Sequence, residues 1–315
     1  MYWVRYLAYS FDTVEERKRF LRWLSGINFD EDHDTIYSKR HPGTGNWLIQ
    51  ESKFEQWFGG DASALLWCFG KRKSPIIIFL PDYINSCISW HREVSLSVSQ
   101  YRLQSTTVLI SWHRSIVLEH ITTKHGLDDK VGVAFAYFKY DSSESQEPSR
   151  VVSTFIKQLC WKKEQIPQHL LDFYHTYDRD VRIPAFDKYK DNFFCLAKSF
   201  DQIFIVIDAL DECKQDEQNG IQNREQIMNF IFNLADDMPC AKFFVTSRRE
   251  TDIADAFARH KTPTIQIEAK NVAEDIDAYI NDRVENLMEA KKLRLGKPTL
   301  KGKIVELLVA RAEGM

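Results

Sequence analysis

Three acidic side chains follow an apolar segment in the middle of the chain. Residues 204–207 read Phe-Ile-Val-Ile, and Asp208, Asp211 and Glu212 come soon after them. A buried strand that ends in carboxylates places them at the carboxyl edge of an α/β sheet, where such sheets bind ligands. In phosphate-handling proteins of this layout, the first Asp holds Mg²⁺ and a later acid positions the attacking water. The pattern therefore predicts a nucleotide-phosphate site.

Five short apolar runs are predicted to form the sheet that carries these acids. They are nearly continuous rather than alternating, which is typical of parallel strands covered by helices on both faces. The runs are Leu65–Phe69, Val131–Tyr140, Ile203–Ile207, Lys242–Thr246 and Thr264–Ile267. Helical patterns lie between the later runs, around residues 149–159, 193–200 and 227–234. This alternation predicts an α/β fold with a doubly wound parallel sheet.

Further helices are predicted before and after the sheet. One runs from Thr13 to about Gly26, and two follow the last strand, at Val272–Glu289 and Leu300–Ala312. Gly-Lys-Pro at 296–298 separates the last two, as a helix break should. We therefore divide the chain into an N-terminal helical linker (1–60), a core (61–270) and the start of a truncated helical domain (271–315).

A phosphate-binding loop should follow the first strand, but its sequence is interrupted. The Walker A motif G-x-x-x-x-G-K-[ST] uses glycines to let backbone N–H groups cradle phosphate, a Lys to reach the β- and γ-phosphates, and a hydroxyl to bind Mg²⁺. Gly70 and Lys71 stand where this motif begins, and Ser115 stands where its hydroxyl belongs, at the start of a helix. Residues 72–114 contain no glycine, and no Gly-Lys-Ser or Gly-Lys-Thr occurs in the chain. Only the two edges of a phosphate loop remain.

The interrupting segment, residues 72–114, has three interpretations. It is Ser-rich and without a clear pattern, and Ile-Ser-Trp-His-Arg occurs in it twice, at 88–92 and 110–114. The first interpretation is that the segment is a retained intron or mis-spliced product. The second is that it is a genuine insertion that removes or remodels the loop. The third is that the strand assignment is wrong. We favour the retained intron, because both flanks fit a phosphate-loop protein and the interior does not.

Composition argues against several other classes of protein. The 315 residues are 44% hydrophobic and 28% charged, which are globular values. A net charge of −3 argues against a nucleic-acid partner, and the six cysteines show no metal-binding spacing. The longest apolar run, residues 76–80, is far too short to span a bilayer. Because no signal-peptide pattern opens the chain, we expect a cytoplasmic protein.

Motifs along the chain resemble the NACHT-type NTPase module of fungal NOD-like receptors, also known as a nephrocystin-3-like N-terminal domain, within the STAND class of signalling ATPases. The resemblance covers nearly the whole chain except residues 72–114. The motifs, in order, are Pro-Gly-Thr-Gly-x-Trp at 42–47, Ala-Tyr-Phe-Lys-Tyr-Asp at 136–141, Asp-Ala-Leu-Asp-Glu at 208–212, Thr-Ser-Arg at 246–248 and Asn-Val-Ala-Glu-Asp-Ile at 271–276. The resemblance implies a P-loop NTPase-like sheet with helical N- and C-terminal extensions.

The resemblance also implies roles for individual residues. A Walker B acid and the loop hydroxyl would bind Mg²⁺, an acidic pair would orient the hydrolytic water, and a sensor-1 arginine would read the γ-phosphate. The implied catalytic residues are Asp211, Glu212 and Arg248; the cofactor-binding residues are Gly70, Lys71 and Ser115; and the metal ligands are Asp208 and Ser115. The chain departs from the family where the Walker Lys and its preceding glycines are missing.

The function implied by the family is a nucleotide-dependent switch. ADP would hold a closed state, exchange for ATP would open it, and slow hydrolysis with Mg²⁺ would reset it. Because Walker A is interrupted, we expect ATP/ADP binding and any ATPase activity to be impaired in this chain. The alternative is a non-catalytic interaction scaffold, or a mis-spliced product without nucleotide binding. Self-association and other signalling domains are the expected partners, with neither nucleic acid nor a membrane.

Overall fold

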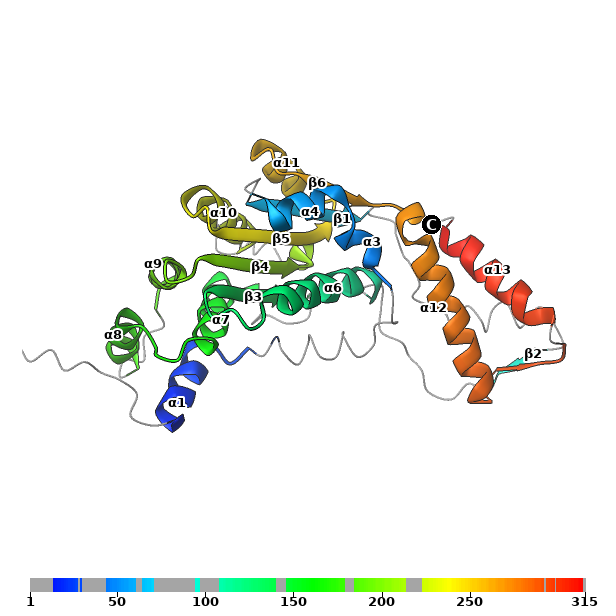
Figure 1. Cartoon of the computed structure of the whole chain (residues 1–315), viewed down its shortest axis with the longest axis horizontal. Helices are drawn as coiled ribbons and strands as arrows, with labels where there is room; N and C mark the ends of the chain where they lie inside the picture. The colour runs from blue at the N-terminus through cyan, green and yellow to red at the C-terminus, as the bar shows by residue number, and fades with distance from the viewer. Residues whose placement is uncertain are drawn as a thin grey trace, which may run out of the picture.

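The computed structural model consists of a sheet flanked by helices and of a helical hairpin beyond one end of that sheet (Figure 1). It describes residues 14–27, 29, 44–60, 64–70, 94–96, 108–139, 146–178, 184–213, 223–291, 293–297 and 299–313. Lys71, the side chain of Ser115 and most of residues 72–114 lie outside the described residues. The sequence-based expectations for them therefore stay predictions.

A five-stranded parallel sheet forms the centre of the fold. Its strands are β1 (Leu65–Gly70), β3 (Val131–Tyr137), β4 (Gln202–Asp208), β5 (Ala241–Arg248) and β6 (Thr264–Ile267). They lie in the order β3-β4-β5-β1-β6, and every pairing is parallel. The predicted strands and the parallel sheet are confirmed, with the second strand ending at Tyr137 rather than Tyr140. β1 and β4 are not neighbours, because β5 lies between them.

One face of the sheet is covered by α4 (Ser52–Gly59) and α6 (Val108–His125). Alternate residues of paired strands point to the same face, so Phe204 and Phe244 lie on one side of the sheet. The Phe58 ring of α4 stacks on Phe204 with 5.4 Å between centroids, and Phe54 contacts Phe244 at 6.1 Å. His125, at the end of α6, stacks on the Phe204 ring at 5.6 Å. The aromatic side chains of α4 thus fill the space between that helix, α6 and the sheet.

The other face is covered by helices from later in the chain. These are α7 (Pro148–Trp161), α9 (Phe186–Ala197), α10 (Asn223–Asp237) and α11 (Thr251–Arg259). Phe193 of α9 contacts Phe155 of α7 and Phe230 of α10, at 6.4 Å and 5.4 Å between centroids. Trp67 of β1 stacks on Phe257 of α11 at 5.1 Å, and its indole N–H donates to the Ser247 hydroxyl of β5. Helices on both faces are what the continuous apolar strands predicted.

The first described helix, α1 (Val14–Leu24), is attached to α7 and to α8 (Gln168–Tyr177). Its apolar stripe puts Phe20 and Trp23 edge-on against the Tyr174 ring. The Arg17 guanidinium donates to the carbonyl oxygens of Glu164 and Cys160 at the end of α7, where a cation is favoured by the helix dipole. Among the described helices, none is long and apolar enough to cross a membrane.

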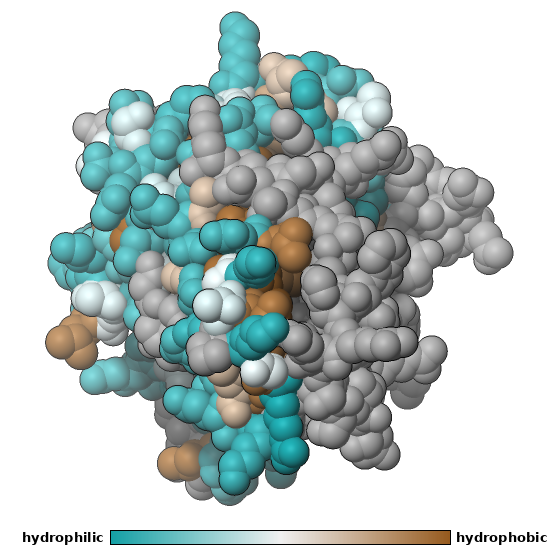
Figure 2. All heavy atoms as spheres, turned by 90° about the vertical axis from the view of Figure 1, so that its right-hand side faces the viewer, coloured by the Kyte–Doolittle hydropathy of each residue, from teal (hydrophilic) through white to brown (hydrophobic). Residues whose placement is uncertain are grey.

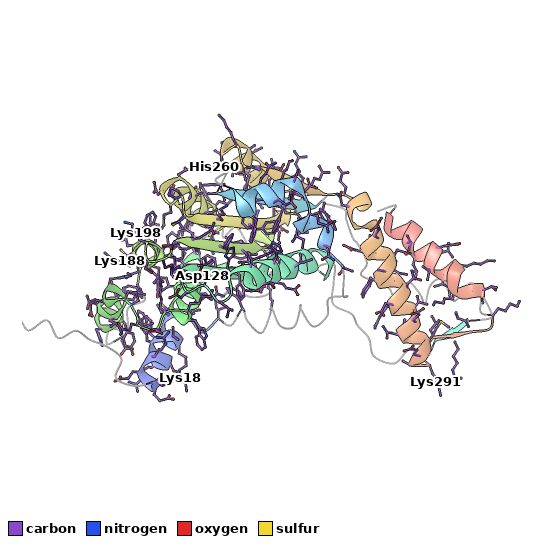
Figure 3. The ribbon with its side chains drawn as sticks, in the orientation of Figure 1. Lys18, Asp128, Lys188, Lys198, His260 and Lys291 are labelled. Carbon is purple, nitrogen blue, oxygen red and sulfur yellow. The ribbon has the colours of Figure 1, made fainter. Side chains whose placement is uncertain are left out.

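The last part of the chain forms α12 (Ala269–Glu289), β7 (Leu293–Leu295) and α13 (Thr299–Glu313). Figure 1 shows this unit beyond the carboxyl ends of the strands, and Figure 3 places Lys291 at its far tip. Seen from this side, the described surface is largely hydrophilic, with hydrophobic residues in a narrow band (Figure 2). The two predicted C-terminal helices are thus present, each beginning slightly earlier than expected.

Two described elements fall within residues 72–114, the predicted interruption. Strand β2 (Val94–Leu96) pairs antiparallel with β7 in a separate two-stranded sheet. Helix α6 begins at Val108 rather than near Ser115, so residues 108–114 belong to the same helix as Ser115. The expectation that this helix starts at Ser115 is therefore wrong by about two turns, because the second copy of Ile-Ser-Trp-His-Arg is itself compatible with a helix.

Candidate functional site

The carboxyl ends of three neighbouring strands bring the candidate residues to one edge of the sheet. Asp208 is the last residue of β4, Arg248 the last of β5 and Gly70 the last of β1. Gly70 and Arg248 are direct register partners across the β1–β5 pair. Parallel strands end at a common edge, so acids and an arginine far apart in sequence meet where open α/β sheets bind ligands.

Asp208 is completely buried and is held by the neighbouring strand. The Thr246 hydroxyl of β5 donates to Asp208 Oδ1 at 2.6 Å, and accepts the backbone N–H of Ala209 at 3.1 Å. Ala209 adopts a left-handed conformation, with φ of 55°, which turns the chain sharply out of β4. One hydroxyl therefore fixes both the carboxylate and the start of the turn. Thr246 belongs to the Thr-Ser-Arg motif, but nothing in that motif predicted this role.

The second acid, Asp211, is bound to the sensor-like arginine. It lies in a short 3₁₀ helix, η2 (Leu210–Glu212), together with the partly exposed Glu212. The Asp211 carboxylate accepts the Arg248 backbone N–H at 2.8 Å and the Arg248 Nε–H at 2.5 Å. The Asp211 side chain is 4% exposed and the Arg248 side chain 50%. The hydrogen bond that Arg248 donates to Asp211, opposed by partial burial, raises the pKa of the Arg248 guanidinium above its usual value.

This pairing differs from the separate roles that the resemblance implied for the two residues. In the structure, both carboxylate oxygens of Asp211 accept hydrogen bonds from Arg248. Asp211 orients an arginine here, and Glu212 is the other acid of the same turn. A role for Asp211 in holding water, or for Arg248 in reading a phosphate, requires this pair to separate.

Arg224 joins the acidic turn to α11, a contact that no sequence pattern indicated. Its Nη2 donates to the Asp211 carbonyl at 2.6 Å, and its Nε donates to the Cys213 carbonyl at 2.9 Å. Its Nη1 forms an ion pair with Asp252, at the start of α11, at 2.9 Å. The Arg224 side chain is 11% exposed. The turn that carries the acids is therefore held from outside the sheet as well as from β5.

Helix α6, which contains Ser115, runs antiparallel to the strands. This direction decides at which end of the sheet the backbone of Ser115 lies. The last residue of α6, His125, lies on Phe204 near the start of β4. Ser115 is ten residues earlier in α6, a rise of about 15 Å. Asp208 is four residues after Phe204 in β4, a rise of about 13 Å. The backbone of Ser115 thus lies at the same end of the sheet as Asp208, and its role as a magnesium ligand stays a prediction.

Asp208 is a buried carboxylate at the sheet edge that could bind a hard cation. No group of three or more His, Cys, Asp or Glu side chains in the described part of the chain is placed to hold a metal ion. In phosphate-processing sites, Mg²⁺ is bound by one or two carboxylates together with waters and the phosphates themselves. The Asp208 carboxylate, fixed by Thr246 at the sheet edge, fits this donor set.

The strand order and the acidic edge define a P-loop NTPase-like α/β module. Residues 107–248 match the family model described as Nephrocystin 3, N-terminal, which agrees with the resemblance to a NACHT-like module. The matched segment contains α6, β3, β4 and β5 and therefore Asp208, Asp211 and Arg248. It begins at residue 107, close to the start of α6.

No curated protein matches the chain. Among solved structures, the chain is similar to a structure of C. elegans PCH-2, with 13% sequence identity and a TM-score of 0.22 over 59% of this chain. The chain spans about half of that protein, 49% of its length. The strand pairing and the family match, not this similarity, define the fold.

Proposed function

We propose that the chain carries the nucleotide-binding module of a STAND-class signalling switch, with ATP and ADP as its ligands. The observation that carries this proposal is the meeting of Asp208, Asp211 and Arg248 at the carboxyl edge of a parallel sheet, within the segment that matches the family model. Acids and a cation at this edge suit a phosphate with its metal, because phosphate transfer relies on positioning and charge compensation.

Each residue has a definite task in this proposal. Mg²⁺, when bound, would neutralise charge on the phosphate oxygens and polarise them. Asp208 and Ser115 would hold that ion, and Gly70 and Lys71 would begin the loop around the phosphates. Glu212 would orient the attacking water, joined by Asp211 once Arg248 has left its carboxylate.

The Asp211–Arg248 pair is the nucleotide-free arrangement in this proposal. Half of the Arg248 side chain is exposed, so its guanidinium can turn to an incoming phosphate without opening the core. That movement would release the Asp211 carboxylate beside Glu212 for water. The exchange of one ion pair for another gives the edge two states, which is the property that a nucleotide switch needs.

The proposal also includes impairment, since the interruption removes the Walker Lys and its glycines. The alternative is a scaffold that binds partners without nucleotide, in which residues 72–114 are a genuine insertion. The pairing of β2, from within these residues, with β7 favours this alternative. Transcript sequencing across the codons for Gly70 to Ser115 separates the two accounts. We expect a spliced form that lacks most of codons 72–114. If every transcript retains them, the retained-intron interpretation is wrong.

The magnesium role of Asp208 has a direct test in a chain with a restored phosphate loop. Asp208→Asn removes the charge that would hold Mg²⁺ and keeps the shape. We expect it to reduce the gain in ATP affinity on adding Mg²⁺ by about tenfold or more, the effect of losing one charge-assisted contact. Calorimetric titration in Mg²⁺ and in EDTA measures that gain.

Asp201→Asn is the matched control, because Asp201 precedes β4 at the opposite end and pairs with Lys130 at the surface. It should leave the gain unchanged. Equal losses in the two variants, or a full magnesium gain in Asp208→Asn, would contradict the proposed site.

A further inference from the structure

Arg224 makes three contacts that together connect the acidic turn, which carries Asp211 and Glu212, to the start of α11. Two of its nitrogens donate to backbone carbonyls on either side of Glu212, those of Asp211 and Cys213. The third pairs with Asp252 in the first turn of α11, a few residues after Arg248. A planar guanidinium has five N–H donors in a fixed fork, so it can hold such a three-point geometry, which a lysine cannot.

The position of Arg224 in its own helix is electrostatically unfavourable. It lies in the first turn of α10, where the helix dipole favours anions and disfavours a cation. The two carbonyl acceptors and the Asp252 carboxylate offset that cost. Asp252, in turn, is at the start of α11, where an acid is favoured. The arrangement stabilises the loops of the sheet edge rather than the helix that carries Arg224.

We propose that Arg224 is a positioning residue for the acidic turn, holding Asp211 and Glu212 in place through the backbone carbonyls of Asp211 and Cys213 while Arg248 changes partners. This inference rests on the proposed function only in assuming that the acidic turn serves a nucleotide site. Arg248 is half exposed and binds the Asp211 side chain, whereas the Arg224 side chain is 11% exposed and binds the Asp211 main chain. When Arg248 leaves Asp211 for a phosphate, Arg224 keeps the turn attached to α11.

Hydrogen exchange of the full chain without nucleotide tests this inference. The informative amides are Glu212 and Cys213, which close the 3₁₀ turn, and Arg248, which donates to Asp211. We expect Arg224→Ala to accelerate exchange at these amides by about tenfold or more, as the loss of hydrogen bonds to a charged group should. Amides in the centres of β4 and β5 should keep their wild-type rates. Acceleration throughout the sheet, or none at the turn, would overturn the proposal.

A spectroscopic readout separates positioning from general support of the fold. The Nε–H of Arg248 binds the Asp211 carboxylate, so its proton resonance reports that pair directly. We expect Arg224→Ala to shift this resonance towards that of an exposed arginine, and an unchanged resonance would contradict the inference. Arg224→Lys keeps the charge but not the fork, and should give exchange rates between those of Arg224→Ala and the wild type. Wild-type exchange in Arg224→Lys would show that charge alone suffices, against the proposal.

Arg17→Ala is the matched control, because Arg17 also donates to three backbone carbonyls, at the end of α7 and far from the site. It should loosen α1 and leave the acidic turn unchanged. None of these measurements uses nucleotide, so they decide the role of Arg224 independently. Failure of the proposed function would appear instead in the titration of Asp208→Asn.

Discussion

Mg-ATP is expected to bind at least a hundredfold more tightly once the phosphate loop is restored. The restoration replaces residues 72–114 with five residues that end in Gly-Lys directly before Ser115, which gives the G-x-x-x-x-G-K-[ST] spacing counted from Gly70. In the chain as written, no glycine-rich turn lets backbone N–H groups converge on the β-phosphate. The Walker Lys is missing too, and one charge-assisted contact of this kind is worth about 1.5–3 kcal/mol, roughly ten- to a hundredfold in affinity. Calorimetric titration of both chains with ATP and Mg²⁺ measures the difference.

The same replacement with Gly-Met in place of Gly-Lys is the control for this experiment. It has the same length and the same glycine but no ammonium group, so its affinity should fall between those of the two chains. Since the deletion also removes β2, the thermal midpoint should be compared to establish that the shorter chains fold. Micromolar binding by the chain as written would show that residues 72–114 supply a phosphate site of their own, and our interpretation of the interruption would be wrong.

The second large effect is expected in stability, at a buried lysine of β5. Lys242 is 6% exposed, and its ammonium donates to the carbonyls of Trp57, Phe58 and Gly60 at the end of α4. A cation at a helix C-terminus opposes the negative end of the dipole. Lys242→Met leaves these carbonyls without that donor, at a cost of about 1–3 kcal/mol for each one that stays buried. We expect the free energy of unfolding to fall by about 2–4 kcal/mol, since desolvation of the charge is also relieved.

Lys53→Met provides the comparison, because Lys53 belongs to the helix that Lys242 caps. Its ammonium is exposed and donates to a single carbonyl, that of Thr264. An exposed contact of this kind should contribute less than about 0.5 kcal/mol. Urea unfolding followed by tryptophan fluorescence gives both values. Equal stability of Lys242→Met and the wild type would mean that water replaces the ammonium at the end of α4.

The strands were predictable because their signal is local. The runs of β1, β3 and β4 are each apolar over at least five consecutive residues, as burial on both faces requires. The run of β5 has three such residues, and that of the edge strand β6 alternates, but all five runs form strands of the central sheet. The helices after β6 were predictable for a similar reason, from their apolar period and the Gly-Lys-Pro break. Strand β7 was not, since three residues paired with β2 form no pattern that a sequence window can detect.

The candidate acids were also predictable, but not their partners. Asp208 and Asp211 follow an apolar strand, so their place at the sheet edge follows from strand direction alone. That Asp208 is held by Thr246, and Asp211 by Arg248, depends on β5 lying next to β4. Strand order is fixed by long-range packing, and nothing in either segment encodes its neighbour.

The sequence by itself determined which segments are buried, in which direction the strands present their acids, and that no Gly-Lys-Ser or Gly-Lys-Thr follows the first strand. Only the tertiary structure decided that an arginine closes on Asp211, that Arg224 ties the acidic turn to α11, and that Lys242 caps a helix nearly two hundred residues earlier. The physical reason is the range of the interactions. The apolar pattern and its period are properties of a single element. The partner of a buried charge depends instead on which other element packs against it in the folded chain.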